Sequence, residues 1–330
     1  MRVATASGIR VARWAVLAAS IAISYAAAPG TESPPLPGLD TGKICVVDMG
    51  SNTFKLILGE IVGGTYIERH VEKKTLQVGD DMSQTGRISE GKLREIHETL
   101  TEFKSRCESK GAVSVKAVAT AAFREAENGS EVLDIGKRVQ IPVEIASEER
   151  ESTLAYLTAT NGVGNRAVID NGSRTIELVS RHLDDAPVWK VVKLGYRAAY
   201  DQFFLNAATF ADAHDRMAAA LAREYGDLQF IAGRRDFVGI ELDELATYLL
   251  KKKNVSGARI KLSVLRKRIE KLRAQTAEQF SALKTVREID RVLPRIVALD
   301  YILTKTGYRS VVVVSRELGV GLIIEAGLRE

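Results

Sequence analysis

The sequence is poor in cysteine and histidine, the side chains that most often build soft-metal sites. Its 330 residues include only two cysteines and four scattered histidines, namely Cys45, Cys107, His70, His97, His182 and His214. Neither set has the spacing of a metal-ligand cluster, which argues against a metal centre built from them. Cys45 is predicted to lie in a buried strand and Cys107 at the end of a helix. Whether the two cysteines form a disulfide cannot be assigned from sequence alone.

Aromatic side chains are also scarce, at 6% of the chain. They do not interleave with the basic run from Lys251 to Arg273, so the sequence argues against a nucleic-acid-binding protein. A polyphosphate chain would be attracted to this run, but a solvated helix face paired with nearby glutamates is the favoured interpretation. The net charge of +5 is mild, so it suits an anionic ligand without requiring one.

The chain lacks an apolar run long enough to cross a bilayer comfortably. Residues 14–28 carry no charge, but these fifteen residues fall short of the roughly 20 that a spanning helix needs. Three arginines precede this run and small residues follow near Ala26, as in a secretory signal. We interpret residues 1–28 as a signal peptide or N-terminal anchor, and residues 29–42 as a Pro-rich linker.

This interpretation predicts an exported, periplasmic or membrane-anchored protein in which only the N-terminal segment would touch a membrane. The alternative is a mis-assigned start codon in front of a cytoplasmic protein.

What the chain does contain is one ten-residue pattern in two copies. Val47–Leu56 and Ile169–Leu178 share the order apolar-Asp-x-Gly-Ser-x-Thr-x-x-Leu. Each copy joins two apolar strands, which predicts a hairpin with a tight turn. Glycine lets backbone N–H groups approach an anion, Ser and Thr add donors, and Asp can hold a divalent cation beside it. The repeat predicts a duplicated fold whose halves face each other across a phosphate.

The apolar pattern predicts a three-strand meander in each half, followed by alternating helices and strands. We expect an α/β protein with domains at residues 43–163 and 164–330. Strands are expected at 44–47, 54–61, 66–76, 113–119, 143–146, 167–169, 175–180, 188–194, 230–231 and 310–314. Helices are expected after Ser89 and at 149–159, 198–224, 240–252, 260–280 and 293–306.

Four segments resemble motifs of one known family. The first hairpin is similar to that family's first phosphate loop. Lys193–Gly195 is similar to the end of the strand that follows the family's second hairpin. Ala119–Ala126 is similar to a segment with a phosphate-holding Arg, and Val143–Tyr156 to a helix start with a catalytic Glu. Over about residues 43–325 the chain therefore resembles the exopolyphosphatase/guanosine pentaphosphate phosphatase (Ppx/GppA) family. The resemblance implies two duplicated actin-like (ribonuclease H-like) domains that face each other across a phosphate-binding cleft.

The resemblance also implies a function, the metal-dependent release of phosphate from polyphosphate or guanosine pentaphosphate, and leaves a homodimer open. Glu151 is implied to be the catalytic base. Mg²⁺ or another divalent cation would be held by Asp48, Asp170 and Glu177. The implied phosphate-binding residues are Gly50, Ser51, Asn52, Thr53, Arg124, Gly172 and Ser173.

Each of these residues also has a purely structural interpretation. Glu151 would be a solvated glutamate in the first turn of a helix, where carboxylates are favoured. Asp48 and Asp170 would cap turns. Arg124 and Glu177 would form ion pairs with neighbouring side chains.

The chain departs from the family pattern at several points. Ser173 and Arg174 replace glycines of the second phosphate loop, Ala232–Arg235 stands for a Ser-Gly-Thr loop, and Leu318–Gly321 lacks a charged pair. Glycine in such a turn often needs positive φ or close ligand approach, so these changes would narrow the cradle. They favour, as an alternative, a catalytically reduced relative that binds polyphosphate or nucleotide as a sensor. A kinase or ATPase of the same superfamily is a third hypothesis, against which the Arg124 and Glu151 segments argue.

Overall fold

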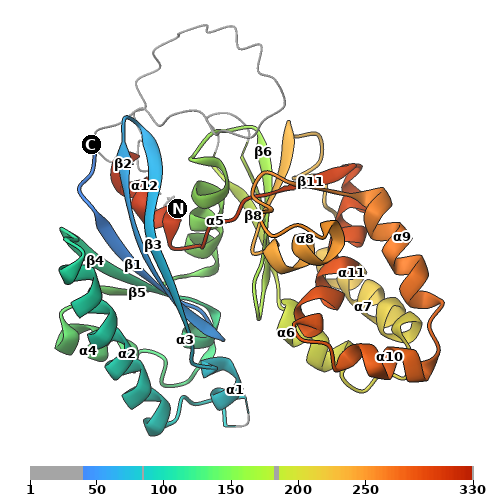
Figure 1. The fold of residues 1–330 in the computed structure, drawn as a ribbon, viewed down its shortest axis with the longest axis horizontal. Coiled ribbons are helices and arrows are strands. Elements are labelled where there is room, and N and C mark those ends of the chain that lie inside the picture. The colour runs from blue at the N-terminus through green and yellow to red at the C-terminus, as the bar shows by residue number, and fades with distance from the viewer. Residues whose placement is uncertain (1–39, 84, 182–185, 329–330) are drawn as a thin grey trace, which may run out of the picture. The chain divides into compact units, whose positions relative to one another are not determined.

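The computed structural model describes residues 40–83, 85–181 and 186–328. The predicted signal or anchor at 1–28 and most of the linker at 29–42 lie outside these residues. Within the described ranges, no helix is long and apolar enough to span a bilayer. The described chain is an α/β fold built on two sheets, as predicted (Figure 1).

The first sheet has five strands in the order β3-β2-β1-β4-β5. Its central strand β1 pairs antiparallel with β2 and parallel with β4. All residues of β1 are buried, which explains the nearly continuous apolar run in the sequence. The strands are β1 (Ile44–Met49), β2 (Thr53–Val62), β3 (Thr65–Thr75), β4 (Ser114–Ala119) and β5 (Val143–Ile145).

Helices α2 and α4 pack on one face of this sheet (Figure 1). α2 begins after Ser89, whose side chain accepts a hydrogen bond from the backbone N–H of Lys92, as expected for an N-cap. The buried residues of α2 include Ile96, Leu100 and Phe103, which belong to the predicted apolar face. The helices of this half are α1 (Val78–Met82), α2 (Glu90–Ser109), α3 (Ala121–Glu125) and α4 (Glu131–Val139).

A disulfide joins Cys45 of β1 to Cys107 of α2. Both cysteines are fully buried, one in a strand and one near a helix end, as predicted. The bond links the strand that leads into the first hairpin turn to the helix that covers its sheet.

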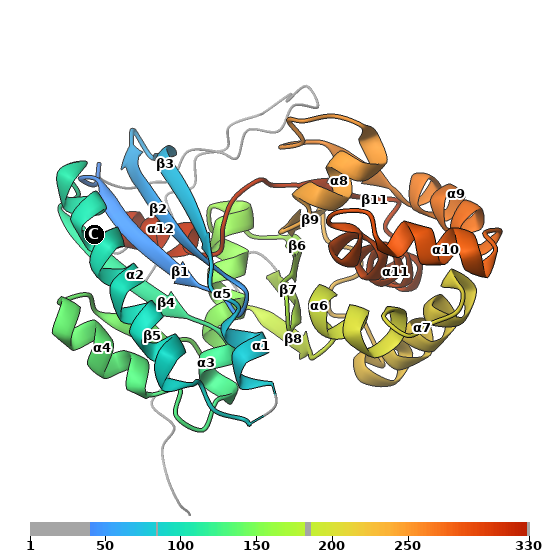
Figure 2. The same cartoon turned by 60° about the horizontal axis from the view of Figure 1, so that its bottom comes forward.

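The second sheet repeats the order of the first. β6, β7 and β8 form an antiparallel meander, β9 joins β6 in parallel, and β11 joins β9 in parallel. β10 adds one antiparallel edge strand. This confirms the predicted duplication (Figure 2). The strands are β6 (Arg166–Asn171), β7 (Ile176–Arg181), β8 (Val188–Val192), β9 (Asp236–Ile240), β10 (Arg259–Lys261) and β11 (Ser310–Val313).

The helices of the second half differ from the sequence prediction at three places. The helix predicted over 198–224 is interrupted, because the Thr209 side chain accepts from the N–H of Asp212 and starts a new helix. The helix predicted over 260–280 starts as a strand and ends before Thr276, which forms a capping box with Gln279. The helices are α6 (Tyr196–Ala199), the π-helical turn η1 (Tyr200–Phe204), α7 (Phe210–Tyr225), α8 (Asp243–Leu250), α9 (Leu262–Arg273), α10 (Ala277–Lys284) and α11 (Ile289–Thr306).

The third difference concerns β9. Residues 236–240 form this strand, whereas the sequence analysis placed a short strand at 230–231 and a helix from 240. Residues 230–231 lie in a turn instead. A short apolar run such as Phe237–Ile240 cannot be assigned to strand or helix by periodicity alone.

Two helices lie in an apolar core that both sheets share. α5 (Glu148–Thr160) and α12 (Val320–Leu328) pack with apolar residues of β1 and β2 from the first sheet and of β6, β7 and β9 from the second. The sequence assigned residues 320–328 to the second domain, but α12 contacts α5, β1 and β2. The chain therefore returns to the first sheet at its C-terminal end, and the boundary between residues 163 and 164 stays a prediction.

Candidate functional site

Both hairpin turns line one cavity of about 100 Å³. Parallel pairing explains this position, because parallel strands end at the same edge of a sheet. Asp48 of β1 lies opposite Val118 of β4, and Asp170 of β6 opposite Ile240 of β9. Residues that follow all four strands line the cavity. Among the predicted residues, the cavity is lined by Asp48, Gly50, Ser51, Asn52, Thr53, Glu151, Asp170, Gly172 and Ser173.

The first turn is closed by its own backbone. The N–H of Gly50 donates to the carbonyl of Thr53 at 3.2 Å. A Cβ on Gly50 would approach that carbonyl to 2.9 Å, so the close approach requires glycine. After β3, the N–H of Gln77 donates to the Asn52 carbonyl and that of Gly79 to the Ser51 carbonyl. The segment after the third strand therefore supports the turn.

The second turn is supported in the same way. After β8, the N–H of Tyr196 donates to the Gly172 carbonyl at 2.9 Å and that of Arg197 to the Ser173 carbonyl at 3.0 Å. A Cβ on Gly195 would lie 2.6 Å from the backbone nitrogen of Arg174, so glycine is required there. Neither Ser173 nor Arg174 has positive φ. The loss of the family's glycines therefore does not strain this backbone, contrary to one concern raised by the sequence.

Arg174 lies at the cavity wall with its guanidinium directed to a carboxylate of α3. Its Nη2 lies 2.7 Å from the Oε2 atom of Glu125, and Lys193 lies 3.4 Å from the other oxygen. Arg174 therefore crosses from the second hairpin to the first half of the molecule instead of leaving the loop free of side chains.

Glu151 lies on the cavity wall in the first turn of α5, and Arg124 fixes its orientation. Ser147 caps this helix by accepting a hydrogen bond from the N–H of Arg150. Arg124 Nη1 donates to Glu151 Oε2 at 2.9 Å and to the Ala146 carbonyl at 2.7 Å. Burial raises the pKa of Glu151, and Arg124 partly opposes that shift. The structure thus brings the predicted base to the cavity, whereas Arg124 contacts the base and does not line the cavity itself.

Asp170 and Glu177 face each other across the second hairpin. Burial raises the pKa of both carboxyl groups well above their usual range. Glu241 and Glu151 raise the pKa of Asp170 further, and Glu151 and Asp170 raise that of Glu177. Asp170 Oδ1 and Glu177 Oε1 are buried, and neither has a hydrogen-bond partner within the described part of the chain. Such carboxylates need a proton or a cation. Asp170 lines the cavity, whereas Glu177 is not among its lining residues.

A closed three-carboxylate metal site does not form here. No group of three or more His, Cys, Asp or Glu side chains within residues 40–83, 85–181 and 186–328 is arranged to hold a metal ion. Mg²⁺ keeps several waters and is usually bound by one or two carboxylates plus substrate phosphates. The unpartnered oxygens of Asp170 and Glu177 fit that kind of binding. The assignment of a metal to this site stays a prediction.

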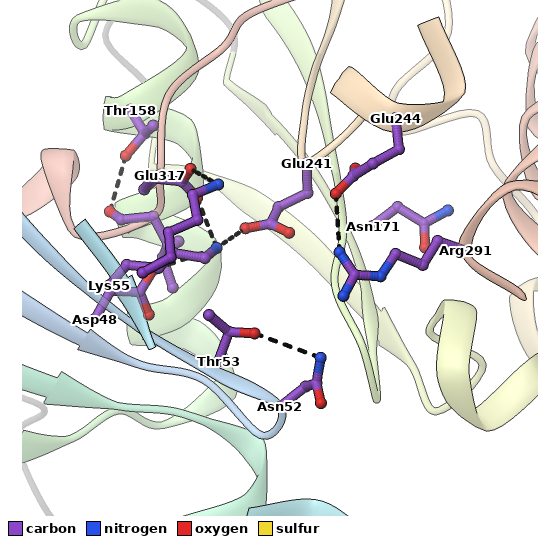
Figure 3. A network of polar contacts seen from close by, with 12 residues as sticks. Asp48, Asn52, Thr53, Lys55, Thr158, Asn171, Glu241, Glu244, Arg291 and Glu317 are labelled. Carbon is purple, nitrogen blue, oxygen red and sulfur yellow. Dashed lines mark hydrogen bonds and ion pairs between the residues drawn. The ribbon is translucent and has the colours of Figure 1, made fainter. Parts of the chain in front are cut away.

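Asp48 instead faces an internal cation that the sequence analysis missed. Lys55, directly opposite Asp48 in the hairpin, lies 3.9 Å from its carboxylate. The ammonium also binds Glu317 at 2.6 Å and forms a close ion pair with Glu241 (Figure 3). Burial raises the pKa of Asp48 to about 7 despite Lys55, and Glu241 adds to the increase. The cross-strand position opposite the repeated Asp was the signal that could have identified Lys55.

Two arginines of α11 complete the wall of the second half, and sequence reasoning missed both. Arg295 is 1% exposed, donates to the Asn171 carbonyl at 3.0 Å and stacks 4.3 Å from the centre of the Tyr196 ring. Arg291 donates to Glu244 at 3.1 Å (Figure 3). Burial alone would raise the pKa of Glu244, but Arg295 and Arg291 outweigh it and lower that pKa.

Two segments that the sequence analysis matched to motifs of the family are placed differently relative to the cavity from what that match implied. Ala232–Arg235 precedes β9, at the end of that strand away from the cavity, because β9 runs parallel to β6 and its last residue pairs with Asp170. Glu241, immediately after β9, lines the cavity instead. Leu318 also lines the cavity, and the charged residue that reaches the site from this segment is Glu317.

Comparison with known proteins agrees with this geometry. Residues 64–294 match the Ppx/GppA phosphatase family. The chain is 29% identical over 151 residues to exopolyphosphatase 1 of Mycobacterium tuberculosis, covering 44% of each chain. It is 27% identical over 201 residues to guanosine-5'-triphosphate,3'-diphosphate pyrophosphatase of Aeromonas salmonicida, covering 58% of this chain and 40% of the relative. The matched segment thus spans less than half the length of these curated relatives.

Solved structures share the fold. A Ppx/GppA family member from Aquifex aeolicus has a TM-score of 0.75 at 22% identity, covering 87% of this chain and 98% of the other. An exopolyphosphatase from Cytophaga hutchinsonii has a TM-score of 0.70 at 20% identity, covering 86% of this chain and 98% of the other. These similarities support the two-domain actin-like architecture.

Proposed function

Because this chain belongs to the Ppx/GppA phosphatase family, we propose that it hydrolyses a phosphoanhydride bond and releases phosphate from polyphosphate or guanosine pentaphosphate. One observation carries the proposal. Glu151, fixed by Arg124, lies on the wall of a cavity that two Asp-Gly-Ser hairpin turns also line. A positioned carboxylate beside paired anion-binding turns is the arrangement that phosphoanhydride hydrolysis needs.

Glu151 acts as the base in the proposed reaction. Its raised pKa makes the carboxylate a better proton acceptor near neutral pH than an ordinary glutamate. It takes a proton from water as the water oxygen bonds to the terminal phosphorus. The bond between that phosphorus and the bridging oxygen breaks, and the leaving phosphate keeps the electron pair. Arg124 holds Glu151 in position and thereby limits the conformations that the base samples.

The hairpin turns orient the phosphates in this proposal. Their backbone N–H groups and the hydroxyls of Ser51, Thr53 and Ser173 are among the donors at the cavity. Five carboxyl groups and five cationic side chains line it, so the walls offer no net positive charge to a polyanion when all of them are ionised. This balance supports dependence on an added cation. Mg²⁺ held by Asp170 and Glu177 would neutralise charge on the phosphates when bound.

The test is a phosphate-release assay on the purified protein with polyphosphate and with guanosine pentaphosphate, each with Mg²⁺ and with chelator. We expect phosphate release that requires Mg²⁺ from at least one of the two substrates. Absence of release from both substrates in Mg²⁺ would refute the proposal. Equal release with chelator would refute only the assignment of the metal.

A further inference from the structure

Glu241 is held in an unfavourable backbone conformation at the cavity. It directly follows β9 and has φ of 60°, in the left-handed region that side chains other than glycine rarely adopt. Such strain persists only where the surrounding structure holds it, and it gathers at ligand sites. The conformation needs an explanation in terms of the contacts of its side chain.

Those contacts cross from the second half of the molecule to the first. The Glu241 carboxylate forms a close ion pair with Lys55 of β2 (Figure 3). Its other oxygen lies 3.8 Å from Arg295. Both Lys55 and Glu241 line the cavity. The Glu241 carboxylate thus lies close to one cation from each half of the molecule, within the proposed phosphate site.

The position of Glu241 follows from strand register. Asp170 lies opposite Ile240, so the residue after Ile240 lies beside the start of the second hairpin turn. The carboxylate is therefore held between that turn and Lys55. Lys55 has two further carboxyl neighbours besides Glu241, since Glu317 binds it at 2.6 Å and Asp48 lies 3.9 Å away.

We propose that Glu241 is an internal anion that competes with the incoming phosphate group for Lys55 and Arg295. This inference rests on the proposed phosphate site. An entering phosphate must displace the carboxylate or accept a like charge beside it, and either event weakens binding. Glu241 is then a specificity-determining residue. It disfavours a single phosphate and favours ligands whose further phosphates contribute additional contacts.

The test measures the Kd of inorganic phosphate at fixed Mg²⁺ by titration calorimetry for wild type and Glu241→Gln. We expect Glu241→Gln to bind inorganic phosphate about tenfold more tightly, because the competing charge is gone and Lys55 keeps two carboxylate neighbours. Glu241→Gly, which also relieves the backbone strain, is a second variant in case the first does not fold. Glu288→Gln is the matched control, since Glu288 has φ of 65° outside the cavity.

The outcomes separate this inference from the proposed function. Tighter binding in Glu241→Gln or Glu241→Gly but not in Glu288→Gln supports the inference, as does binding seen only in the Glu241 variants. Wild-type binding with equal or weaker binding in the Glu241 variants overturns the inference and leaves the proposed function standing. Absence of phosphate binding in every protein, the Glu241 variants included, overturns the inference, whereas the proposed function is decided separately by the phosphate-release assay.

Discussion

At the scale of single residues, protonation of Asp48 makes the free energy of unfolding depend on pH. Burial raises its pKa from 3.8 to about 7. Between these values the folded state binds a proton that the unfolded state has released. The free energy of unfolding therefore falls as pH rises through this window, and the stabilisation is fully present only below about pH 4.

We predict that Asp48→Asn flattens this dependence. In the presence of chelator, wild type should lose stability from pH 4 to pH 7, and the variant should lose less, by up to about 4 kcal/mol, since one pKa unit corresponds to 1.36 kcal/mol. Urea unfolding at several pH values measures this difference. Identical slopes for the two proteins would show that Asp48 does not titrate in this window.

The paired changes at Ser173 and Arg174 make a second prediction. The guanidinium of Arg174 is paired with Glu125, and the Arg174 side chain occupies part of the cavity wall. Replacing both residues by glycine removes this side chain from the wall and should raise phosphate release by up to about fivefold, which corresponds to about 1 kcal/mol in activation free energy. A fall in phosphate release would instead identify Arg174 as a phosphate clamp.

The sequence predicted the residues of the site that belong to repeated motifs. Asp48 and Asp170 were identified from the repeated hairpin pattern, whereas Glu151 was identified only through the family resemblance. The structure brings all three to one cavity. Glu241, Arg291 and Arg295 could not be identified in this way. Their place depends on the register of β9 against β6 and on the packing of α11, which no local pattern encodes.

At the scale of elements, the hairpins were predictable and the helices of the second half were less so. The meanders were identified because turn residues separate short runs of apolar and β-branched side chains. The predicted helix at 198–224 failed because its apolar spacing continues through η1 and the break before Thr209, so periodicity alone gave no boundary. A capping side chain marks that boundary, as Thr276 does for α10.

The disulfide between β1 and α2 gives a prediction at the scale of elements. The disulfide closes a sequence separation of 62 residues, for which loop closure predicts a stabilisation of about 4 kcal/mol. Urea unfolding equilibrated with a reductant should show this loss, and the Cys45→Ala/Cys107→Ala variant should not respond to the reductant. Equal stability of the wild type in both conditions would mean that the disulfide does not contribute. We propose an oxidising compartment for this protein, in line with the predicted export.

At the scale of the whole molecule, charged side chains of the two duplicated halves meet at the site. Glu241 with Lys55 and Arg174 with Glu125 each join one half to the other. α5 and α12 lie in an apolar core that both sheets share. Glu151 lies in the first turn of α5, so the helix that carries it contacts both halves. The repeated pattern predicted this duplicated architecture, whereas the return of α12 to the first sheet depends on long-range packing.

The central claim is that Glu151 is the base of a phosphoanhydride hydrolase. The most direct measurement compares polyphosphate binding and phosphate release in Mg²⁺ for wild type, Glu151→Gln and Glu149→Gln, an exposed neighbour in the same helical turn. Glutamine keeps the shape of the side chain but cannot accept the proton. We predict that Glu151→Gln retains binding and loses about 10² to 10⁴ in rate, while Glu149→Gln retains both. Equal turnover in wild type and Glu151→Gln would contradict the account.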